Sequence, residues 1–188
     1  MNTLPKILST RWTTKTQATE ALQLEFSNGA QREFFRVHPA GGGSVLVVAV
    51  QNDQVLLTRE YACGLHRYEL GLPRGHIDAG ESALEAANRE LQEEAGFAAR
   101  KLTLLRTLAL VPSYMSHHIH VVLAEDLYAS PLPGDEPEPI EVLHYPMAAL
   151  EALAMHEEFS DGRALGALLV ARAYLAGLRM SDALVQSS

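Results

Sequence analysis

The side chains best suited to chemistry in this chain are the carboxylates of Glu90, Glu93 and Glu94. In a helix, residues four apart lie on one face, so Glu90 and Glu94 would stack, with Glu93 on the outer flank. Like charges at this spacing weaken a helix by roughly 0.2–0.5 kcal/mol, and the helix dipole disfavours carboxylates near its C-terminal end. Hard divalent cations such as Mg²⁺ prefer clustered carboxylate oxygens and bridge to substrate phosphates. The cluster therefore predicts a metal site.

A second interpretation of the same residues is a solvated helix face on which opposite charges pair. Arg89 can reach Glu85, one turn back, or it can hold Glu93 in place. Ion pairs of this kind contribute little to stability and need no ligand. The helix considered alone leaves both interpretations open.

The element that presents these carboxylates is predicted to be a helix over residues 82–95. Ser82 to Glu85 has the pattern of a capping box, and Gly96 follows where a left-handed residue ends a helix. The preceding loop, residues 75–81, has glycine at positions 75 and 80, which lets backbone approach a metal or a phosphate closely. Four apolar side chains recur at helical spacing on one stripe: Leu84, Ala87, Leu91 and Ala95.

The rest of the chain predicts an α+β domain. Asn28-Gly29 between two alternating runs indicates a hairpin, preceded by a loosely ordered or strand-forming arm over residues 1–20. We expect residues 1–40 to form this arm and hairpin, and residues 41–188 the main domain. Further strands are expected at 44–50, 55–61, 67–70, 102–111, 118–123 and 140–145, and helices at 148–155 and from a cap at Asp161 to about Gly177. Strands with two or three helices form layered α+β domains.

Composition narrows the partners and the compartment. The chain has 188 residues and a net charge of −8, which argues against a nucleic-acid polymer as the main partner. The single cysteine, Cys63, excludes an intrachain disulfide; we expect it to be a small packed residue in a cytoplasmic protein. The first residues lack the apolar core of a signal peptide, and no apolar run approaches the roughly 20 residues of a membrane span.

The stretch from Gly75 to Phe97 matches every fixed position of the Nudix box, G-x5-E-x7-R-E-U-x-E-E-x-G-U, where U is apolar. The matching residues are Gly75, Glu81, Arg89, Glu90, Leu91, Glu93, Glu94, Gly96 and Phe97. The chain thus resembles the Nudix hydrolases, which cleave a nucleoside diphosphate linked to another group, X. The resemblance implies a Nudix-type α/β/α sandwich with a mixed sheet. It also implies a pyrophosphohydrolase that uses Mg²⁺, with Mn²⁺ or another divalent cation able to substitute.

Outside the box, roughly residues 20–180 resemble the ADP-ribose pyrophosphatase branch of this family. The stretches that carry the resemblance are 24–29, 59–62, 68–71, 112–114, 126–128 and 134–139. They imply hydrolysis of ADP-ribose, NADH or diadenosine polyphosphates with release of AMP, and a homodimer joined through the N-terminal hairpin. Ala62 and Gly71 stand where many members have arginine and glutamate, so strict selectivity for ADP-ribose is not implied. Alternatives are another nucleotide sugar, such as GDP-mannose, and a non-catalytic nucleotide-binding module.

The resemblance also implies roles for individual acidic residues. Glu90 and Glu94 are expected metal ligands, and the backbone carbonyl of Arg74 would complete the inner shell. Glu93 is either a ligand, directly or through water, or the catalytic base. In this branch a glutamate from a late loop also serves as base, which points to Glu136 and, second, Glu138. Two further site residues are Glu81, as a metal ligand or a partner of Arg89, and Arg89 itself.

Substrate contacts carry alternatives as well. Arg59 is either a phosphate clamp or a surface charge, and Arg74 is a candidate for cationic phosphate contact. Phe35 and Arg36 either stack on adenine or pack in a dimer seam. Tyr114 either lines the pocket or is a buried residue at a strand end. His117, His118 and His120 invite a zinc interpretation, but without a cysteine nearby we expect surface or substrate-edge histidines.

Overall fold

The computed structural model describes residues 4–9, 18–38 and 42–177. Residues 1–3 and 10–17 of the predicted arm lie outside the described part, as do residues 39–41 and the end of the chain after residue 177. The predictions that fall on these residues are therefore not tested by the structure.

The centre of the fold is a mixed sheet built around one apolar strand, β3 (Ser44–Gln51). Residues 45–49 of this strand are fully buried, as its near-continuous apolar run predicts. The strand order is β5-β4-β3-β8-β7, with β6 pairing to β3 and β9 to β4. β3 and β8 run parallel, and every other pair is antiparallel. The remaining bounds are β4 (Gln54–Ala62), β5 (Arg67–Gly71), β6 (Arg74–His76), β7 (Phe97–Ala109), β8 (His118–Ala129) and β9 (Glu141–Pro146).

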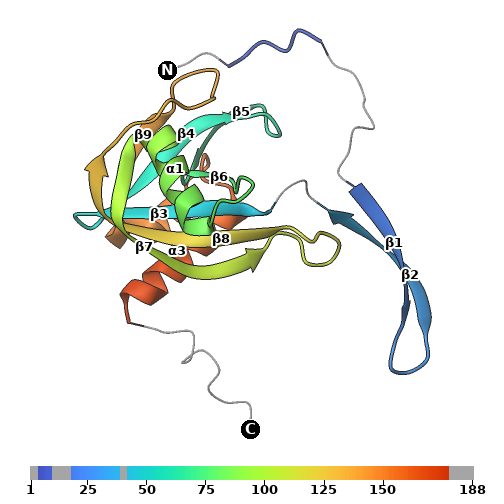
Figure 1. The fold of residues 1–188 in the computed structure, drawn as a ribbon. Helices are drawn as coiled ribbons and strands as arrows, with labels where there is room; N and C mark the ends of the chain where they lie inside the picture. Colours follow the sequence, from blue (N-terminus) through green and yellow to red (C-terminus); the bar gives the residue numbers. More distant parts are fainter. Residues whose placement is uncertain (1–3, 10–17, 39–41, 178–188) are drawn as a thin grey trace.

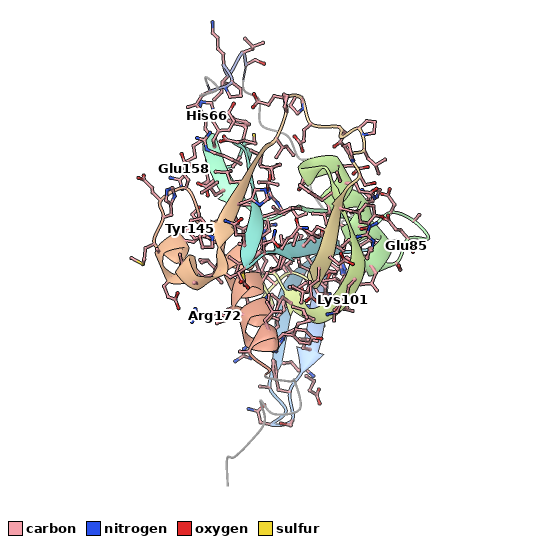
Figure 2. The ribbon with its side chains drawn as sticks, turned by 90° about the vertical axis from the view of Figure 1, so that its left-hand side faces the viewer. His66, Glu85, Lys101, Tyr145, Glu158 and Arg172 are labelled. Carbon is pink, nitrogen blue, oxygen red and sulfur yellow. The ribbon has the colours of Figure 1, made fainter. Side chains whose placement is uncertain are left out.

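Helices cover both faces of this sheet (Figure 1). Val45 and Val47 of β3 pack with helix α1 (Ala83–Ala95), whereas Leu46 and Val48 pack with α2 (Leu150–Ala154) and α3 (Gly162–Leu175). In Figure 2 Glu85 marks the side of α1, and Arg172 marks the opposite side, that of α3. Because successive side chains of a strand point to opposite faces, one strand serves both cores. The predicted α/β/α sandwich with a mixed sheet is confirmed.

The helix α1 begins and ends at the residues that its sequence predicts. Ser82 accepts a hydrogen bond from the Glu85 N–H, and the Glu85 carboxylate accepts one from the Ser82 N–H, which closes the capping box. Gly96 adopts the left-handed conformation, with φ of 76°, and donates to the Gln92 carbonyl. Strong caps at both ends fix where the carboxylates of the last turn lie relative to the sheet.

Several element bounds differ from those expected from sequence. The strand expected at 102–111 begins at Phe97, and the strand expected at 118–123 continues to Ala129. The two pair along nearly their whole length, so pairing extends each strand beyond its apolar run. The short strand β6 was expected as loop, because three residues with two polar side chains carry no alternation. The helix expected at 148–155 is a 3-10 turn, η1 (Met147–Ala149), followed by α2.

The N-terminal hairpin is present and stands apart from the sandwich (Figure 1). β1 (Ala18–Glu25) and β2 (Gln31–His38) pair in register, and Gly29 has the positive φ that the turn requires. The hairpin is fastened to the sandwich near its end. The Val37 N–H donates to the Tyr114 carbonyl at 2.8 Å, and the Val37 carbonyl accepts from the Ser116 N–H at 3.1 Å.

Two further observations concern single residues and the membrane. Cys63, expected to be packed, is exposed in the turn between β4 and β5, so that prediction is wrong. The turn of residues 63–66 joins two paired strands and has no hydrophobic core beneath it. The tendency of cysteine to be buried could not show that Cys63 lies in such a turn. Among the described residues, no helix combines the length and hydrophobicity needed to cross a bilayer.

Candidate active site

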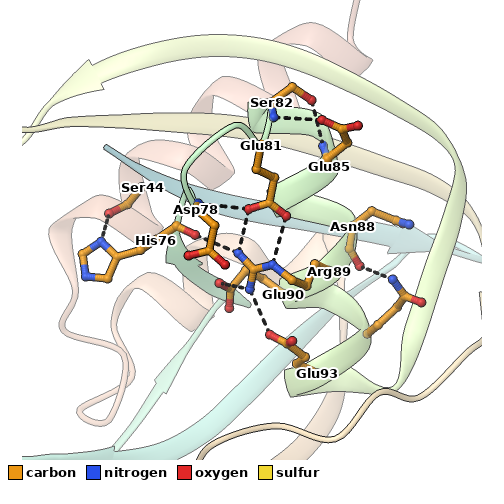
Figure 3. Close-up of polar contacts among 11 residues, drawn as sticks. Ser44, His76, Asp78, Glu81, Ser82, Glu85, Asn88, Arg89, Glu90 and Glu93 are labelled. Atoms are coloured by element: carbon orange, nitrogen blue, oxygen red, sulfur yellow. Dashed lines mark hydrogen bonds and ion pairs between the residues drawn. The ribbon is translucent and has the colours of Figure 1, made fainter. Parts of the chain in front are cut away.

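The guanidinium of Arg89 is the centre of the loop and helix that carry the predicted site (Figure 3). It donates to both oxygens of Glu81 at 3.0 and 2.9 Å, to Glu90 at 2.7 Å and to Glu93 at 3.0 Å. It also donates to the backbone carbonyl of His76 at 2.9 Å, which ties the loop to the helix. These hydrogen bonds raise the pKa of Arg89, chiefly through Glu81. One cation therefore organises three carboxylates.

This arrangement places Glu81 as a partner of Arg89. Its carboxylate also accepts from the Asp78 N–H at 3.1 Å, which closes the loop before α1. The hydrogen bonds from Arg89 are the main cause that lowers the pKa of Glu81. Glu85 takes no part, because it is engaged in the capping box with Ser82.

Gly75 lies directly against the carboxylate of Glu90. A Cβ built on Gly75 would overlap the Oε1, Cδ and Oε2 atoms of Glu90. β6 can therefore pass beneath the helix only because position 75 has no side chain. Glu90 itself is buried, and this burial raises its pKa. The close approach explains the need for glycine in physical terms.

Glu94 is held from the other side, by the backbone of β6. The Arg74 N–H donates to Glu94 Oε2 at 2.9 Å. Burial is the largest cause that raises the pKa of Glu94, to about 8; the Arg74 hydrogen bond opposes it, and the charge of Glu60 adds to it. The positive charge of Arg74 offsets only part of the effect of burial and of the neighbouring carboxylates.

Helix α1 and the loop between β8 and β9, residues 130–140, enclose a cleft of about 280 Å³. This loop is called the acidic loop below. The loop is fastened to the end of α1, because the Leu132 N–H donates to the Gln92 carbonyl at 3.2 Å. Burial raises the pKa of Glu136, and the charges of Glu60 and Asp135 add to the effect. The carboxylates that line the cleft are Glu90, Glu93, Glu94, Asp135, Glu136 and Glu138.

Glu136 and Glu138 have different surroundings within this loop. Tyr68 of β5 donates its hydroxyl to Glu138 at 2.7 Å, so this carboxylate is bound to the sheet. Glu136 lines the cleft with Glu94, and it also lines two neighbouring cavities. Glu136 thus lies where the cleft meets both neighbouring cavities, which are described below.

Arg59 lines a second, more apolar cavity of about 270 Å³, with Tyr61, Tyr68 and Pro5. Its guanidinium binds Glu158 at 3.0 and 3.1 Å and lies 5.0 Å from the centroid of the Tyr68 ring. Arg59 is therefore neither a solvated surface charge nor an unpaired phosphate clamp. A sequence gives no warning of this pairing, because Glu158 lies ninety-nine residues away.

The remaining predicted substrate residues lie at different distances from the cleft. Arg74 lines a third cavity and pairs with Glu60 at 2.5 Å. On the hairpin, Arg36 pairs with Glu20, and Phe35 is 61% exposed. Tyr114 is exposed at the base of the hairpin rather than buried at a strand end. The described chain does not bring Phe35, Arg36 or Tyr114 into the lining of the cleft or its two neighbours.

The three histidines for which a zinc site was considered, His117, His118 and His120, lie in different environments. His118 is exposed, and His120 forms a hydrogen bond with Thr107 at 3.0 Å. His117 was expected at the surface or at the edge of the substrate; it is buried, and its Nε2 lies 3.1 Å from Ser44 Oγ. The surface alternative is wrong for His117 because this residue immediately precedes β8, whose pairing with β3 carries it inward.

A divalent cation fits the chemistry of the cleft. Among the described residues, no three His, Cys, Asp or Glu side chains already converge as a formed metal site. However, burial raises the pKa of Glu90, Glu94 and Glu136, which line one cleft. Such an excess of desolvated carboxylate oxygen is the donor set that Mg²⁺ and similar ions take. The residues present therefore suit the ion that the sequence predicts.

Sequence reasoning missed three contributors to this region. Glu60 faces Glu94 electrostatically from β4, and Asp135 joins Glu136 in the cleft lining. Arg163, at the start of α3, lines the third cavity beside His117. Glu60 could have been predicted from the sequence, because it follows Arg59 on a strand that leads toward the Nudix box. Arg163 had none, since a charge in a first helical turn is ordinary.

The sandwich and the carboxylate-bearing helix define a Nudix enzyme, and the comparisons agree. The chain belongs to the Nudix hydrolases: the NUDIX domain matches residues 42–164. The N-terminal domain of NudE-type Nudix hydrolases matches residues 5–36. The family predicted from the box is confirmed, and with it the enzyme class.

The chain is also similar to individual Nudix proteins of known name and to a solved structure. ADP compounds hydrolase NudE of Escherichia coli K12 is 45% identical over 158 residues, covering 84% of this chain and 85% of that protein. ADP-ribose pyrophosphatase of Bacillus subtilis 168 is 29% identical over 147 residues, covering 77% of each. A crystal structure of ADP compounds hydrolase superposes with a TM-score of 0.80 at 42% identity, covering 93% of this chain and 96% of that one.

Proposed function

We propose that this protein hydrolyses the pyrophosphate bond of ADP-linked compounds and releases AMP. The substrates in view are ADP-ribose, NADH and diadenosine polyphosphates. The observation that carries the proposal is the cleft in which Glu90, Glu94 and Glu136 meet with raised pKa values. The names of the two relatives, an ADP compounds hydrolase and an ADP-ribose pyrophosphatase, support the substrate class.

The residues that would hold Mg²⁺, or Mn²⁺ in its place, are Glu90 and Glu94, with the Arg74 carbonyl and Glu93 completing the set. When bound, the ion supplies positive charge that screens the diphosphate and polarises the bond to be broken. Glu81 serves by fixing Arg89, which in turn orients Glu90 and Glu93. The carboxylates are thus prepositioned by protein contacts and not by the ion alone.

Glu136 is our proposed catalytic base. It lines the same cleft as Glu94, whereas Glu138 is tied to Tyr68. Its raised pKa brings its proton affinity nearer to that of a water activated beside a metal. Water attacks one phosphorus as its proton passes to Glu136, and the bridging P–O bond breaks with its electron pair on the departing oxygen. The products are AMP and a phosphate that carries X.

The cavity beside the acidic loop suits the adenosine half of such a substrate. Tyr61, Tyr68 and Pro5 give it an apolar wall next to Glu136. Arg59 stiffens this wall through Glu158 and its position over the Tyr68 ring. Aromatic faces bind nucleobases by stacking, each worth about 1–3 kcal/mol.

Product analysis tests the proposal directly. We expect AMP from ADP-ribose, NADH and diadenosine triphosphate in the presence of Mg²⁺, and none after chelation. If GMP were released from GDP-mannose faster than AMP from these substrates, the substrate class would be another nucleotide sugar instead of ADP-linked compounds. Tight binding of ADP-ribose without turnover would indicate a binding module. Hydrolysis in ¹⁸O-labelled water would report which phosphorus is attacked.

A further inference from the structure

A third cavity, of about 330 Å³, adjoins the acidic cleft and shares Glu94 and Glu136 with it. Its other wall comes from separate parts of the chain: the start of β3, β6, the residue before β8, and the first turn of α3. Apart from the Arg74 carbonyl, which would bind the metal, the roles proposed above leave this wall unused. A substrate held over Glu90 and Glu94, with adenosine in the apolar cavity, would extend its leaving group in this direction.

Ser44 joins two imidazoles in this wall. Its hydroxyl lies 3.1 Å from His117 Nε2 and 3.4 Å from His76 Nδ1, the second contact being drawn in Figure 3. The sheet brings them together, because Ser44 pairs with His76 on β6 and with Ile119 on β8. His117 is only 8% exposed, and among the described residues its ring is hydrogen-bonded through Nε2 to Ser44, while the residue lines the cavity. The second ring nitrogen of an imidazole held in this way can bind a ligand in the cavity.

The two arginines that line this cavity are each paired with a carboxylate. Arg163 pairs with Asp161 at 2.7 Å, and Arg74 pairs with Glu60 at 2.5 Å. Burial is the largest cause that lowers the pKa of His117, and nearby His76 and Arg163 add to it. His117 is therefore neutral at physiological pH, so the wall offers neutral donors and acceptors rather than a strong cationic patch.

Groups that both donate and accept hydrogen bonds recognise hydroxyls. A serine hydroxyl and the neutral imidazole of His117 can do both, as sugar hydroxyls do. Met115 and Leu110 line the same cavity and give the apolar contact that a sugar ring face needs. Resting on the proposed function, we propose that this cavity, formed by Ser44, His76 and His117, binds the sugar of the departing group X. ADP-ribose and NADH, each of which carries a second ribose, would use it.

The test compares two substrates that differ only in this sugar. ADP-ribose carries it, whereas ADP methyl ester has a methyl group in its place and still yields AMP. We expect His117→Gln to lower kcat/KM for ADP-ribose at least about tenfold more than for ADP methyl ester, the loss typical of an unmade hydrogen bond in a buried site. His118→Gln is the matched control, since that neighbouring side chain is exposed and outside the cavity lining.

Equal losses for the two substrates would overturn the assignment, because they would show a structural role for His117. No loss for either would overturn it as well. If the wild-type protein cleaves neither substrate, the proposed function fails, and a binding measurement still decides the subsite. Ribose 5-phosphate added with Mg²⁺ should shift the His117 imidazole signals in NMR, whereas AMP should not. Absence of that shift at saturating ribose 5-phosphate would reject the subsite independently of turnover.

Discussion

At the scale of single residues, the site is governed by how its carboxylates are neutralised. Arg89 donates four hydrogen bonds to the carboxylates of Glu81, Glu90 and Glu93 and a fifth to the His76 carbonyl, and its positive charge compensates the three carboxylates. Among the described residues Glu94 accepts a hydrogen bond from the Arg74 N–H, and it remains strongly desolvated. An added cation would therefore stabilise the charged form of Glu94.

Glu94→Gln should separate activity from stability. We expect turnover to fall at least about a hundredfold, because a metal-binding oxygen is lost. The folded-state pKa of Glu94 is raised to about 8, so the wild-type carboxyl stabilises the fold below about pH 4.5 and loses this contribution as pH rises to 8. The metal-free variant should thus melt at a higher temperature than metal-free wild type at pH 8. Thermal unfolding with EDTA measures this, and an unchanged rate with Mg²⁺ would contradict the metal assignment.

The two glutamates of the acidic loop should differ in their effect on rate. We expect Glu136→Gln to lower kcat by about 10²- to 10⁴-fold, the contribution of a general base. Glu138→Gln keeps a group able to accept from Tyr68 and serves as the matched control, with a much smaller loss. Steady-state kinetics with ADP-ribose decides between them. A larger loss for Glu138 would move the base to that residue, and small losses for both would favour Glu93.

At the scale of elements, the site depends on how closely β6 and the acidic loop approach α1. Gly75 lets β6 lie against Glu90, and Leu132 fastens the loop to the last turn of the helix. The capping box and Gly96 fix both ends of α1 between these two segments. The active-site geometry is therefore set by backbone contacts on either side of one helix.

Gly75→Ala tests this close approach. The new Cβ would overlap the Glu90 carboxylate, so we expect a loss of about 1–3 kcal/mol in the free energy of unfolding, together with impaired turnover. Gly64→Ala is the matched control, because a Cβ there meets nothing within 4 Å. Chemical denaturation of both variants gives the comparison. Equal stability of the two would show that β6 can move away from Glu90 at no cost.

At the scale of the whole molecule, the hairpin is joined to the sandwich, within the residues that the structure describes, near Val37 and His38. Backbone hydrogen bonds at Val37 and a contact between His38 and Ser116 at 3.0 Å hold the hairpin beside the segment that leads to His117. Phe34 and Phe35 of β2 are exposed, as are Leu24 and Phe26. A two-stranded hairpin with exposed aromatic side chains is marginal alone and is stabilised by a partner.

The homodimer that the family resemblance implies should depend on this surface. We expect light scattering after gel filtration to give twice the chain mass for the wild-type protein. Replacing Phe34 and Phe35 with serine should shift it toward the monomer, because the apolar area buried at the seam is lost. Leu169→Ser, at a residue 70% exposed on α3, is the control and should leave the mass unchanged. A wild-type monomer at micromolar concentration would reject the dimer.

The sequence by itself determined the parts of this protein that rest on local chemistry. The capping box at Ser82, the left-handed Gly96 and the turn at Gly29 follow from a few neighbouring residues, and so did the helix and the hairpin. The spacing from Gly75 to Phe97 likewise identified the family. Such features depend on backbone conformation and on contacts within a few residues, which a sequence shows directly.

Only the tertiary structure decided which distant groups meet. It paired Arg59 with Glu158, brought Glu60 near Glu94, and buried His117 against Ser44. It also paired Glu81 with Arg89, which is one of the two roles that the sequence left open, and it exposed Cys63. These outcomes depend on strand order and register, and pairing between β3, β6 and β8 is a property of the whole sheet. Side chains whose contacts cannot be predicted from the sequence became neighbours because the sheet placed their strands side by side.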